Sequence, residues 1–416
     1  MFYLLVGIFI LFFAYLCWQH LDWAFYLTII CLPAYGVRFS IGALPLTLLE
    51  VMIVALFGVW LMKAWHDEQL RPSSKFFGVA AVIFVIATMA MLVSPDLRAA
   101  AGLWKAYFLE PLLFFLVFSG FVKTKDDLYR TIMVLGIPAL YISTFAIVQK
   151  LNDGWLVPYQ YWYLGEGPRV TSFFSYPNAI GLFVAPIVVL FIGYWYITFR
   201  IRDWPDTMYS AAVIITGLLA IYWAHSEGAL VGIMAALVFM GLADRRFRWL
   251  TIACVLLLLL VVVAVGAGPA AWQKLTLQDW SGSVRLSMWG ETAQLLQDHW
   301  IIGAGLAGYP AALVPYHRAT YLEIFLYPHN FILNFWVELG LAGLLAFGYI
   351  TVKYFWLAAR LLFTSRESKM RLALALSGAM VVIVVHGLVD VPYFKNDLAV
   401  LWWILVGMMS TLSESV

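Results

Sequence analysis

The sequence contains few charged residues. Only 12% of its 416 residues are Asp, Glu, Lys or Arg, whereas 64% are hydrophobic and 17% are aromatic. Soluble domains carry about 25% charged and about 45–50% apolar residues, so this composition excludes an ordinary soluble protein. The formal net charge is only +2. It gives no indication of a nucleic-acid partner, and none is expected.

Cysteine and metal-binding motifs are also scarce. The three cysteines, Cys17, Cys31 and Cys254, all lie in apolar stretches, where buried free thiols are expected rather than a disulfide or metal framework. None of the seven histidines forms an HxxxH or HExxH pair, so no metal site is expected. The G-x-G-x-x-G match at residues 303–308 follows no predicted strand, and we interpret it as a turn rather than a dinucleotide site.

Long apolar segments occupy most of the chain. Each is about long enough to cross a bilayer as a helix, which predicts an all-α integral membrane protein made of a single polytopic domain, residues 1–416. The N-terminal segment lacks a basic start and a small-residue cleavage site, so we expect a retained helix rather than a signal peptide. Thirteen spans are predicted, or 12 if the first 36 residues form one broken element: 2–18, 23–36, 43–62, 76–93, 100–120, 129–149, 177–198, 209–224, 228–242, 249–267, 329–352, 371–388 and 397–412.

The distribution of basic residues predicts the orientation. Sixteen of the 25 Lys and Arg residues lie in five connections that fall on one side when the spans alternate, and basic loops remain cytoplasmic. These residues are Lys63, Arg71, Lys75, Lys123, Lys125, Arg130, Arg200, Arg202, Arg245, Arg246, Arg248, Lys353, Arg360, Arg366, Lys369 and Arg371.

The opposite, outer side then holds two long loops, about 150–176 and 268–328. Loops of this length are uncommon unless they contain secondary structure or have a function. Trp and Tyr residues are frequent in both, either as interfacial anchors or as platforms for sugar rings. No internal repeat is visible in the sequence, which argues against the inverted-repeat architecture of many transporters.

An amphipathic helix is predicted at about 284–300 in the larger loop. Val284, Met288 and Leu295 fall on its apolar arc, whereas Glu291 falls on the polar arc. Arg285 projects into the apolar arc, where an unpaired guanidinium would be costly. It either pairs with a structural carboxylate or forms a fork for a phosphate group.

A second polar group opens the long span after this loop. His329 stands at its outer mouth, where it is either a general base or a helix-end residue bonded to backbone. Glu338 lies deeper in the same helix, as a functional group or as a partner for a basic residue. Before the seventh span, Arg169 is a candidate for phosphate or sugar contact, and Asn178 is predicted to cap the following helix.

The motifs that contain these residues resemble those of a known family. The stretch from about 170 to 400 is similar to the O-antigen ligase and polymerase superfamily of bacterial envelope enzymes, whereas the first 120 residues add only hydropathy. The matching features are Arg169…Phe174…Pro177-Asn178, Arg285-x-x-x-Trp289, Gly303-x-Gly305 and His329-Asn330-x-x-Leu333-x-x-x-x-Glu338-x-Gly340.

The resemblance implies a GT-C-like glycosyltransferase without metal or other cofactor, acting on the periplasmic face of the bacterial inner membrane. It implies a lipid-linked oligosaccharide donor on undecaprenyl pyrophosphate and a glycan or lipid acceptor, with inversion at the sugar. Arg285 would hold the pyrophosphate and His329 would be the base. The substrate-binding candidates are Arg169, Arg318, Asn330, Glu338, Trp289 and Tyr327.

Several functions remain open at this stage. Many family members carry Ser-Arg-Gly where this chain has Ser226-Glu227-Gly228, so a donor-binding role for position 227 is in doubt. We favour an O-antigen ligase that transfers to an acceptor such as lipid A-core. A polysaccharide polymerase and a protein O-oligosaccharyltransferase are the nearest alternatives. A transporter or lipid flippase is the rival from another class, and a structural scaffold is a more distant one.

Overall fold

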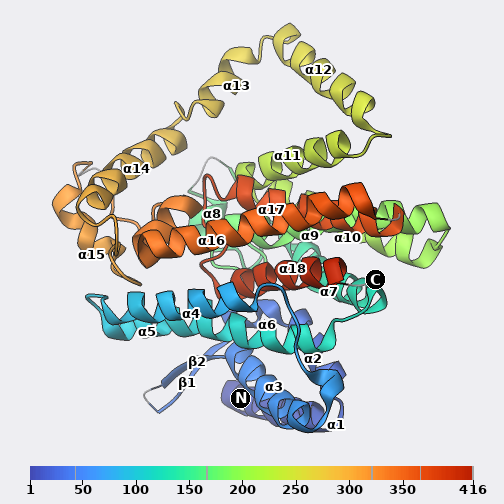
Figure 1. Cartoon of the computed structure of the whole chain (residues 1–416). Coiled ribbons are helices and arrows are strands. Elements are labelled where there is room, and N and C mark those ends of the chain that lie inside the picture. Colours follow the sequence, from blue (N-terminus) through green and yellow to red (C-terminus); the bar gives the residue numbers. More distant parts are fainter. Residues whose placement is uncertain (43, 165–166, 320–321, 366, 415–416) are drawn as a thin grey trace.

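The helices of the computed structural model follow the apolar segments of the sequence (Figure 1). The structure describes residues 1–42, 44–164, 167–319, 322–365 and 367–414. Every one of the 13 predicted segments contains a helix. In chain order these helices are α1 (Phe2–Gln19), α2 (Leu21–Ile30), α3 (Leu48–His66), α4 (Phe77–Leu92), α5 (Leu97–Trp104) with α6 (Glu110–Phe121), α7 (Lys125–Leu151), α9 (Asn178–Ile201), α10 (Trp204–Trp223), α11 (Glu227–Ala243), α12 (Arg248–Ala264), α16 (Phe331–Thr364), α17 (Glu367–His386) and α18 (Asn396–Glu414).

Nine helices in the described part of the chain are long and apolar enough to cross a membrane, with α5 and α6 counted as one. A π-helical turn, Lys105–Leu109, joins those two helices. Four shorter apolar helices, α2, α4, α11 and α12, occupy the remaining predicted spans. The prediction of an all-α integral membrane protein is therefore confirmed. The GT-C-like arrangement of the spans stays a prediction.

One short sheet departs from the helical pattern. Strands β1 (Arg38–Ile41) and β2 (Leu44–Thr47) pair antiparallel, with Arg38 opposite Thr47. Thr47 then caps α3, because its side chain accepts the amide of Glu50 at 3.2 Å and the Glu50 carboxylate accepts the amide of Thr47 at 3.3 Å. This reciprocal cap makes the helix begin at Leu48, later than the predicted start at 43.

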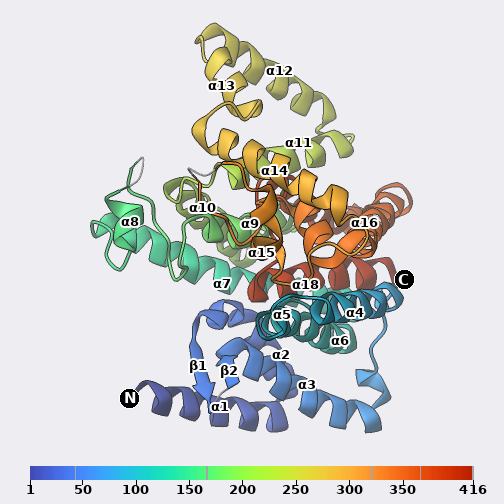
Figure 2. The ribbon, with the colours of Figure 1, turned by 90° about the vertical axis from the view of Figure 1, so that its left-hand side faces the viewer.

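The core lies around α9, α17 and α18. In the apolar stretch of α18, 89% of the residues are buried, against 17% in α1 at the edge of the molecule. Helices α4–α6 lie between the N-terminal helices α1–α3 and the C-terminal helices α16–α18 (Figures 1 and 2). The N-terminal third therefore supports the C-terminal helices without surrounding them.

The basic connections contact one another at one end of the helices. The Lys123 ammonium donates to the Arg71 carbonyl at 2.9 Å, and the Lys353 ammonium donates to the Lys75 carbonyl. These contacts link three of the five basic connections that were predicted to share one side. The opposite end carries the two long loops, and there the candidate residues are found.

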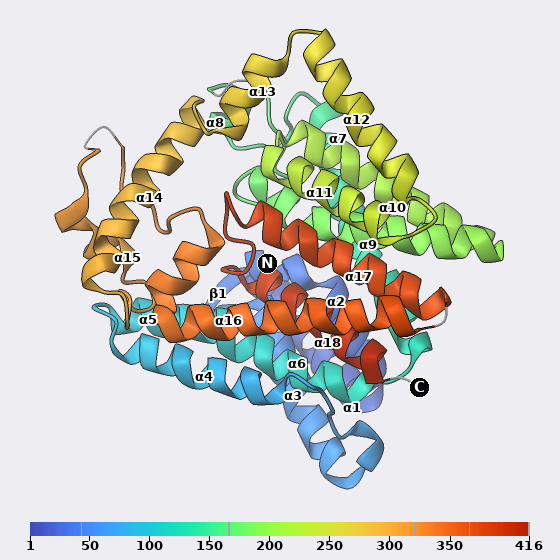
Figure 3. The same ribbon diagram turned by 45° about the horizontal axis from the view of Figure 1, so that its top comes forward.

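The long loop contains three helices, α13 (Gly268–Leu275), α14 (Trp280–Asp298) and α15 (Tyr309–Leu313). Together with α12, helices α13 and α14 form an arch outside the main bundle (Figure 3). Helix α12 has no buried residue among those described. The predicted amphipathic helix at 284–300 corresponds to α14, which begins four residues earlier and ends at Asp298.

Helix α16 is interrupted at Gly340. This glycine has a φ of +69°, and a side chain there would clash with the Ile301 carbonyl oxygen. The segment after α14 fits against this break, because the Leu341 amide donates to Ile301 at 3.0 Å and the Ala304 amide donates to Val337 at 2.7 Å. The Glu338-x-Gly340 pattern thus joins the long loop to the helix that carries His329.

Candidate active site

His329 lies one residue before the N-cap of α16. The cap is Asn330, whose side-chain oxygen accepts the Leu333 amide at 3.0 Å, while its NH2 group donates to the Leu388 carbonyl at 3.0 Å. The Phe331 amide donates to Gly387 at 2.7 Å, so the start of α16 is tied to the connection between α17 and α18. His329 itself has a φ of +45°, which turns its side chain out of the helix.

The partner of His329 comes from that connection. The Nδ1 atom of His329 lies 3.5 Å from the Oδ1 atom of Asp390. The side chain of Asp390 is only 4% exposed, whereas that of His329 is 28% exposed. A buried carboxylate therefore faces one ring nitrogen, and the histidine side chain remains accessible from outside.

Burial alone would raise the pKa of Asp390. The hydrogen bond from His329 and the charges of His386 and His329 outweigh burial and bring the pKa of this carboxyl below its ordinary value. The amide of Val391 adds a further hydrogen bond at 2.9 Å. Asp390 is thus an ionised group at neutral pH. The sequence pattern His386…Asp390 was only a weak indication of it, because nothing in the sequence connects it to His329.

Arg285 reaches the same connection from α14. Its Nε atom donates to the Val389 carbonyl at 3.1 Å, next to Asp390, and its Nη1 atom donates to the side chain of Ser281 at 2.7 Å. The structure therefore brings Arg285 and His329 together, on either side of the loop that holds Asp390. The apolar arc of α14 places the guanidinium there, as the helical spacing predicts.

Trp289 and Tyr327 support the segment before His329. The indole nitrogen of Trp289 donates to the Pro328 carbonyl at 2.8 Å. The ring of Tyr327 packs edge-on against His329 with centroids 4.8 Å apart. Burial raises the pKa of Tyr327 to about 12, although a hydrogen bond with Tyr176 lowers it slightly. Both aromatic candidates therefore lie beside the histidine.

Arg169 lies in another part of the candidate site, between the start of α9 and the end of α10. It donates from Nε to the Ala224 carbonyl at 2.9 Å and from Nη2 to the Asn178 side-chain oxygen at 2.8 Å. The prediction that Asn178 caps α9 is wrong, because the N-cap is Pro177 and the Asn178 side chain accepts from Arg169 instead. Desolvation and the Arg169 charge lower the pKa of the neighbouring His225.

The pattern Ser226-Glu227-Gly228 also reaches this region. A side chain on Gly228 would come within 2.7 Å of the His386 ring, so α11 packs closely against the end of α17. Glu227 forms an ion pair with Lys274 of α13. Glu227 thus holds one side of the arch.

Two candidates do not join His329. Glu338 is buried and accepts the Ala307 amide at 2.8 Å, nine residues further along α16. Arg318 is exposed, and its amide donates to the Glu291 carboxylate at 2.8 Å. Glu291 was expected on the polar arc of α14 but is 7% exposed. It is buried because it also accepts the Ala319 amide at 2.9 Å and bonds His317 Nδ1 at 3.0 Å.

The sequence analysis missed Lys395. Its ammonium lies 3.4 Å from the Asp397 carboxylate and 4.1 Å from the centre of the Phe174 ring. Burial lowers the pKa of Lys395, although the Asp397 charge opposes this shift. Phe174 lies between Arg169 and α9 in the sequence. Through this contact, Lys395 links the segment that carries Arg169 to the segment between α17 and α18 that carries Asp390. A basic residue on the outer side, where few exist, was the one available sequence signal.

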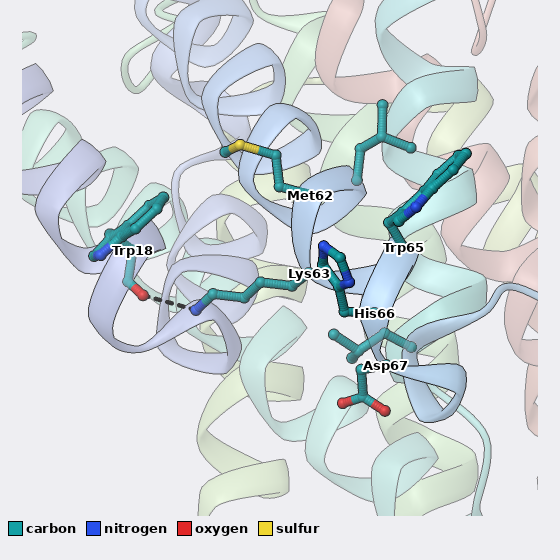
Figure 4. Close-up of a pocket in the computed structure, with 8 residues that line it drawn as sticks. Trp18, Met62, Lys63, Trp65, His66 and Asp67 are labelled. Atoms are coloured by element: carbon teal, nitrogen blue, oxygen red, sulfur yellow. Dashed lines mark hydrogen bonds between the residues drawn. The ribbon is translucent and has the colours of Figure 1, made fainter.

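An open, largely apolar hollow of about 810 Å³ lies far from these residues, at the C-terminal ends of α1 and α3 (Figure 4). It is at the end of the molecule that carries the basic connections. The candidate active site is instead a convergence of polar groups at the opposite end.

Comparison with known proteins supports the resemblance. A family model described as O-antigen ligase matches residues 211–348, about a third of the chain. No curated protein matches the chain. The matched residues include Arg285, His329 and Gly340, whereas Arg169 and Asp390 lie outside them. The predicted similarity to the O-antigen ligase and polymerase superfamily is thereby confirmed, and it indicates O-antigen ligase-like glycan transfer.

Proposed function

We propose that this protein transfers a glycan from undecaprenyl pyrophosphate to an acceptor such as lipid A-core, on the periplasmic face of the bacterial inner membrane. The observation that carries the proposal is the placement of His329 against the buried Asp390, beside Arg285. A base with an ionised partner and a fixed guanidinium together match the needs of a glycosyl transfer from a phosphate leaving group.

His329 is assigned as the general base. With its Nδ1–H directed at Asp390, the neutral ring presents the lone pair of Nε2 to an acceptor hydroxyl. Asp390 fixes this tautomer and stabilises the imidazolium that forms when the proton is taken up. Asp390 is thus a positioning residue, which acts on the reaction through His329.

Arg285 is assigned to the leaving group. Bonds from Nε and Nη1 to protein oxygens hold its guanidinium in one orientation, and we assign Nη2 to the pyrophosphate. A preorganised cation stabilises the charge that develops as the glycosyl–phosphate bond breaks. We expect Arg169 and Arg318 to contact the donor further out.

The chemistry is a single displacement without metal. The acceptor oxygen attacks the anomeric carbon while the bond from that carbon to the phosphate oxygen breaks. His329 takes the hydroxyl proton, and undecaprenyl pyrophosphate leaves with the bond electrons. One displacement inverts the anomeric centre. Trp289 and Tyr327 would present rings to the sugar, whereas Asn330 and Glu338 would act by holding the loops around it.

The test is glycan transfer by the full chain in proteoliposomes, with undecaprenyl-pyrophosphate oligosaccharide as donor. We expect His329→Ala and Arg285→Ala each to reduce transfer about 100-fold or more, and Asp390→Asn about 10–100-fold. His299→Ala is a matched control, because His299 is exposed at the end of α14. A chelator should leave the rate unchanged.

The products separate the remaining alternatives. Transfer of one preassembled chain to lipid A-core favours the ligase, growth of chain length on the carrier favours the polymerase, and labelled protein favours an oligosaccharyltransferase. Full activity in both the His329 and Arg285 variants would refute the site. Movement of the donor across the bilayer without transfer to any acceptor would favour the flippase.

A further inference from the structure

Gln149 is a buried polar residue near the end of α7 that carries the long loops. Helix α7 packs against α9 and α10, the two helices whose ends hold Arg169 (Figure 2). A buried amide without hydrogen bonds is costly, so the side chain of Gln149 must find its partners inside the protein. The identity of those partners indicates what this residue does.

The partners of Gln149 are backbone groups of a single turn. Its Oε1 atom accepts the Thr171 amide at 3.1 Å and the Ser172 amide at 2.7 Å, and its Nε2 atom donates to the Ser172 carbonyl at 3.1 Å. Backbone amides only donate and carbonyls only accept, so both ends of the Gln149 amide match their partners. One side chain therefore holds three backbone groups that lie 22 and 23 residues further along the chain.

The backbone of this turn is strained at Ser172. Its φ of +53° is a conformation that residues with a side chain rarely adopt, and such a conformation persists only where the surrounding contacts determine it. The Ser172 hydroxyl donates to the Ile142 carbonyl at 2.7 Å, so α7 holds the residue at a second point, about two turns before Gln149. Strained residues that are held in this way cluster at functional sites.

The turn lies directly beside Arg169 in the chain, because only one residue separates Arg169 from Thr171. On its other side, Arg169 donates from Nε to the Ala224 carbonyl at 2.9 Å, at the end of α10. The position of the guanidinium thus depends on two supports, the end of α10 and Gln149 of α7. A displacement of the turn would move Arg169 relative to the rest of the candidate site.

We propose that Gln149 is a positioning residue for donor binding, which acts through Arg169. This inference rests on the proposed function, in which Arg169 contacts the lipid-linked glycan. The three bonds from Gln149 hold the turn, and with it Arg169, in place before the donor arrives, so that binding requires less ordering of the loop. Gln149 is buried, and it affects the donor only through this segment.

The experiment is a double-mutant cycle on glycan transfer by the full chain in proteoliposomes, with the donor concentration varied. We expect Gln149→Met and Arg169→Ala each to raise the donor KM about tenfold, with kcat changed by no more than about twofold, because both remove binding rather than chemistry. In the Arg169→Ala background, Gln149→Met should cause no further rise. Gln149→Glu keeps an acceptor for the two amides, so its KM should rise only about threefold.

Ser143→Ala is the matched control. Ser143 is a buried polar residue of the same helix, and its hydroxyl has no hydrogen-bond partner in the part of the chain that the structure describes. Its replacement should leave KM and kcat unchanged. The thermal midpoint in detergent identifies a variant that has failed to fold. If Gln149→Met fails to fold, the cycle is measured with Gln149→Glu.

Additive increases in KM would overturn the inference and assign Gln149 to the general stability of the fold. An unchanged donor KM in either single variant would also overturn it. In both cases transfer by the wild type, and its loss in the His329 and Arg285 variants, would leave the proposed function intact. Absence of transfer by the wild type would instead refute the proposed function, and this inference with it.

Discussion

At the scale of single residues, the buried pair of Lys395 and Asp397 stands beside the candidate active site. Removing one member of a buried ion pair leaves an uncompensated charge, which is strongly destabilising, whereas removing both is often nearly neutral. Lys395 also lies over Phe174, so part of its effect is independent of Asp397. The two contributions can be separated by a double variant.

We expect Lys395→Met to lower the free energy of unfolding by about 3–5 kcal/mol, because Asp397 is then buried without its partner. Lys395→Met combined with Asp397→Asn should recover most of this loss, leaving about 1–2 kcal/mol from the aromatic contact. The measurement is a denaturant titration in micelles followed by tryptophan fluorescence. A double variant as unstable as the single one would show that the ion pair is unimportant.

Residue identities were easier to predict than their partners. Arg285 and His329 could be selected from the sequence, because a cation on an apolar arc and a histidine at a helix mouth are unusual placements. Their common neighbour Asp390 follows His329 by about 60 positions, and no local pattern encodes that contact. The prediction that Asn178 caps α9 was wrong for the same reason. Its side-chain oxygen accepts a hydrogen bond from Arg169, which is separated from it by a loop, and this bond outweighs the local preference of Asn for the N-cap position.

At the scale of elements, the break in α16 determines how the long loop joins the bundle. Gly340→Ala should lower the free energy of unfolding by at least about 2 kcal/mol. A side chain is disfavoured at a φ of +69° and would clash with Ile301. Gly348→Ala is the matched control in the same helix. Nothing lies within 4 Å of the added atom there, and helix propensity favours alanine by up to about 1 kcal/mol.

The same denaturant titration measures both glycine variants. Equal stability of Gly340→Ala and the wild type would mean that the helix can close across the break, and that the loop segment at Ile301 does not depend on it. Transfer activity provides a second readout, because a displaced loop would move Arg285 relative to His329.

The contact between α14 and the segment 317–319 should depend on pH. The hydrogen bond to Glu291 raises the pKa of His317 above its ordinary value. Burial opposes ionisation of Glu291, but the Ala319, His317 and Arg318 bonds together lower its pKa. Because folding raises the pKa of His317, the protonated imidazole stabilises the contact fully below about pH 6.5. This contribution is lost as the pH rises through the pKa that His317 has in the folded state.

We therefore expect hydrogen exchange at 317–319, corrected for intrinsic rates, to be slowest at about pH 5–6 and faster at about pH 8. Protection should fall only partly, because the amides of Arg318 and Ala319 still donate to the ionised Glu291. His317→Gln should remove the pH dependence. An identical profile in that variant would assign the change to another group.

Helices were predictable where hydropathy dominates, and their ends were not. The predicted segments all contain helices because apolar runs of that length have one stable conformation in a bilayer. The capping box at Thr47 and the hairpin before it moved the start of α3, and strands of four residues give too short a pattern to detect. Glu291 was assigned to the polar arc because periodicity cannot anticipate a loop that folds over it.

At the scale of the whole molecule, the sequence predicts which end each connection occupies but not which helices are neighbours. The placement of α4–α6 between the N-terminal and C-terminal helices depends on packing between segments far apart in the chain (Figure 2). The arch of α12–α14 likewise follows from no local pattern (Figure 3). What the basic residues do predict is a common end, and contacts such as Lys353 with Lys75 agree with it.

That common end leads to a topological prediction for the intact cell. In a background in which Cys17, Cys31 and Cys254 are all replaced by Ser, single cysteines are introduced at Gln297 on α14 and at Ser368 near the start of α17. Both positions are exposed, so accessibility to solvent does not distinguish them. A membrane-impermeant maleimide should label Gln297→Cys in spheroplasts and Ser368→Cys only after lysis, because basic connections remain on the cytoplasmic side. Labelling of Ser368→Cys in intact spheroplasts would invert the orientation, and it would place Arg285 and His329 on the face where the lipid-linked glycan is not expected.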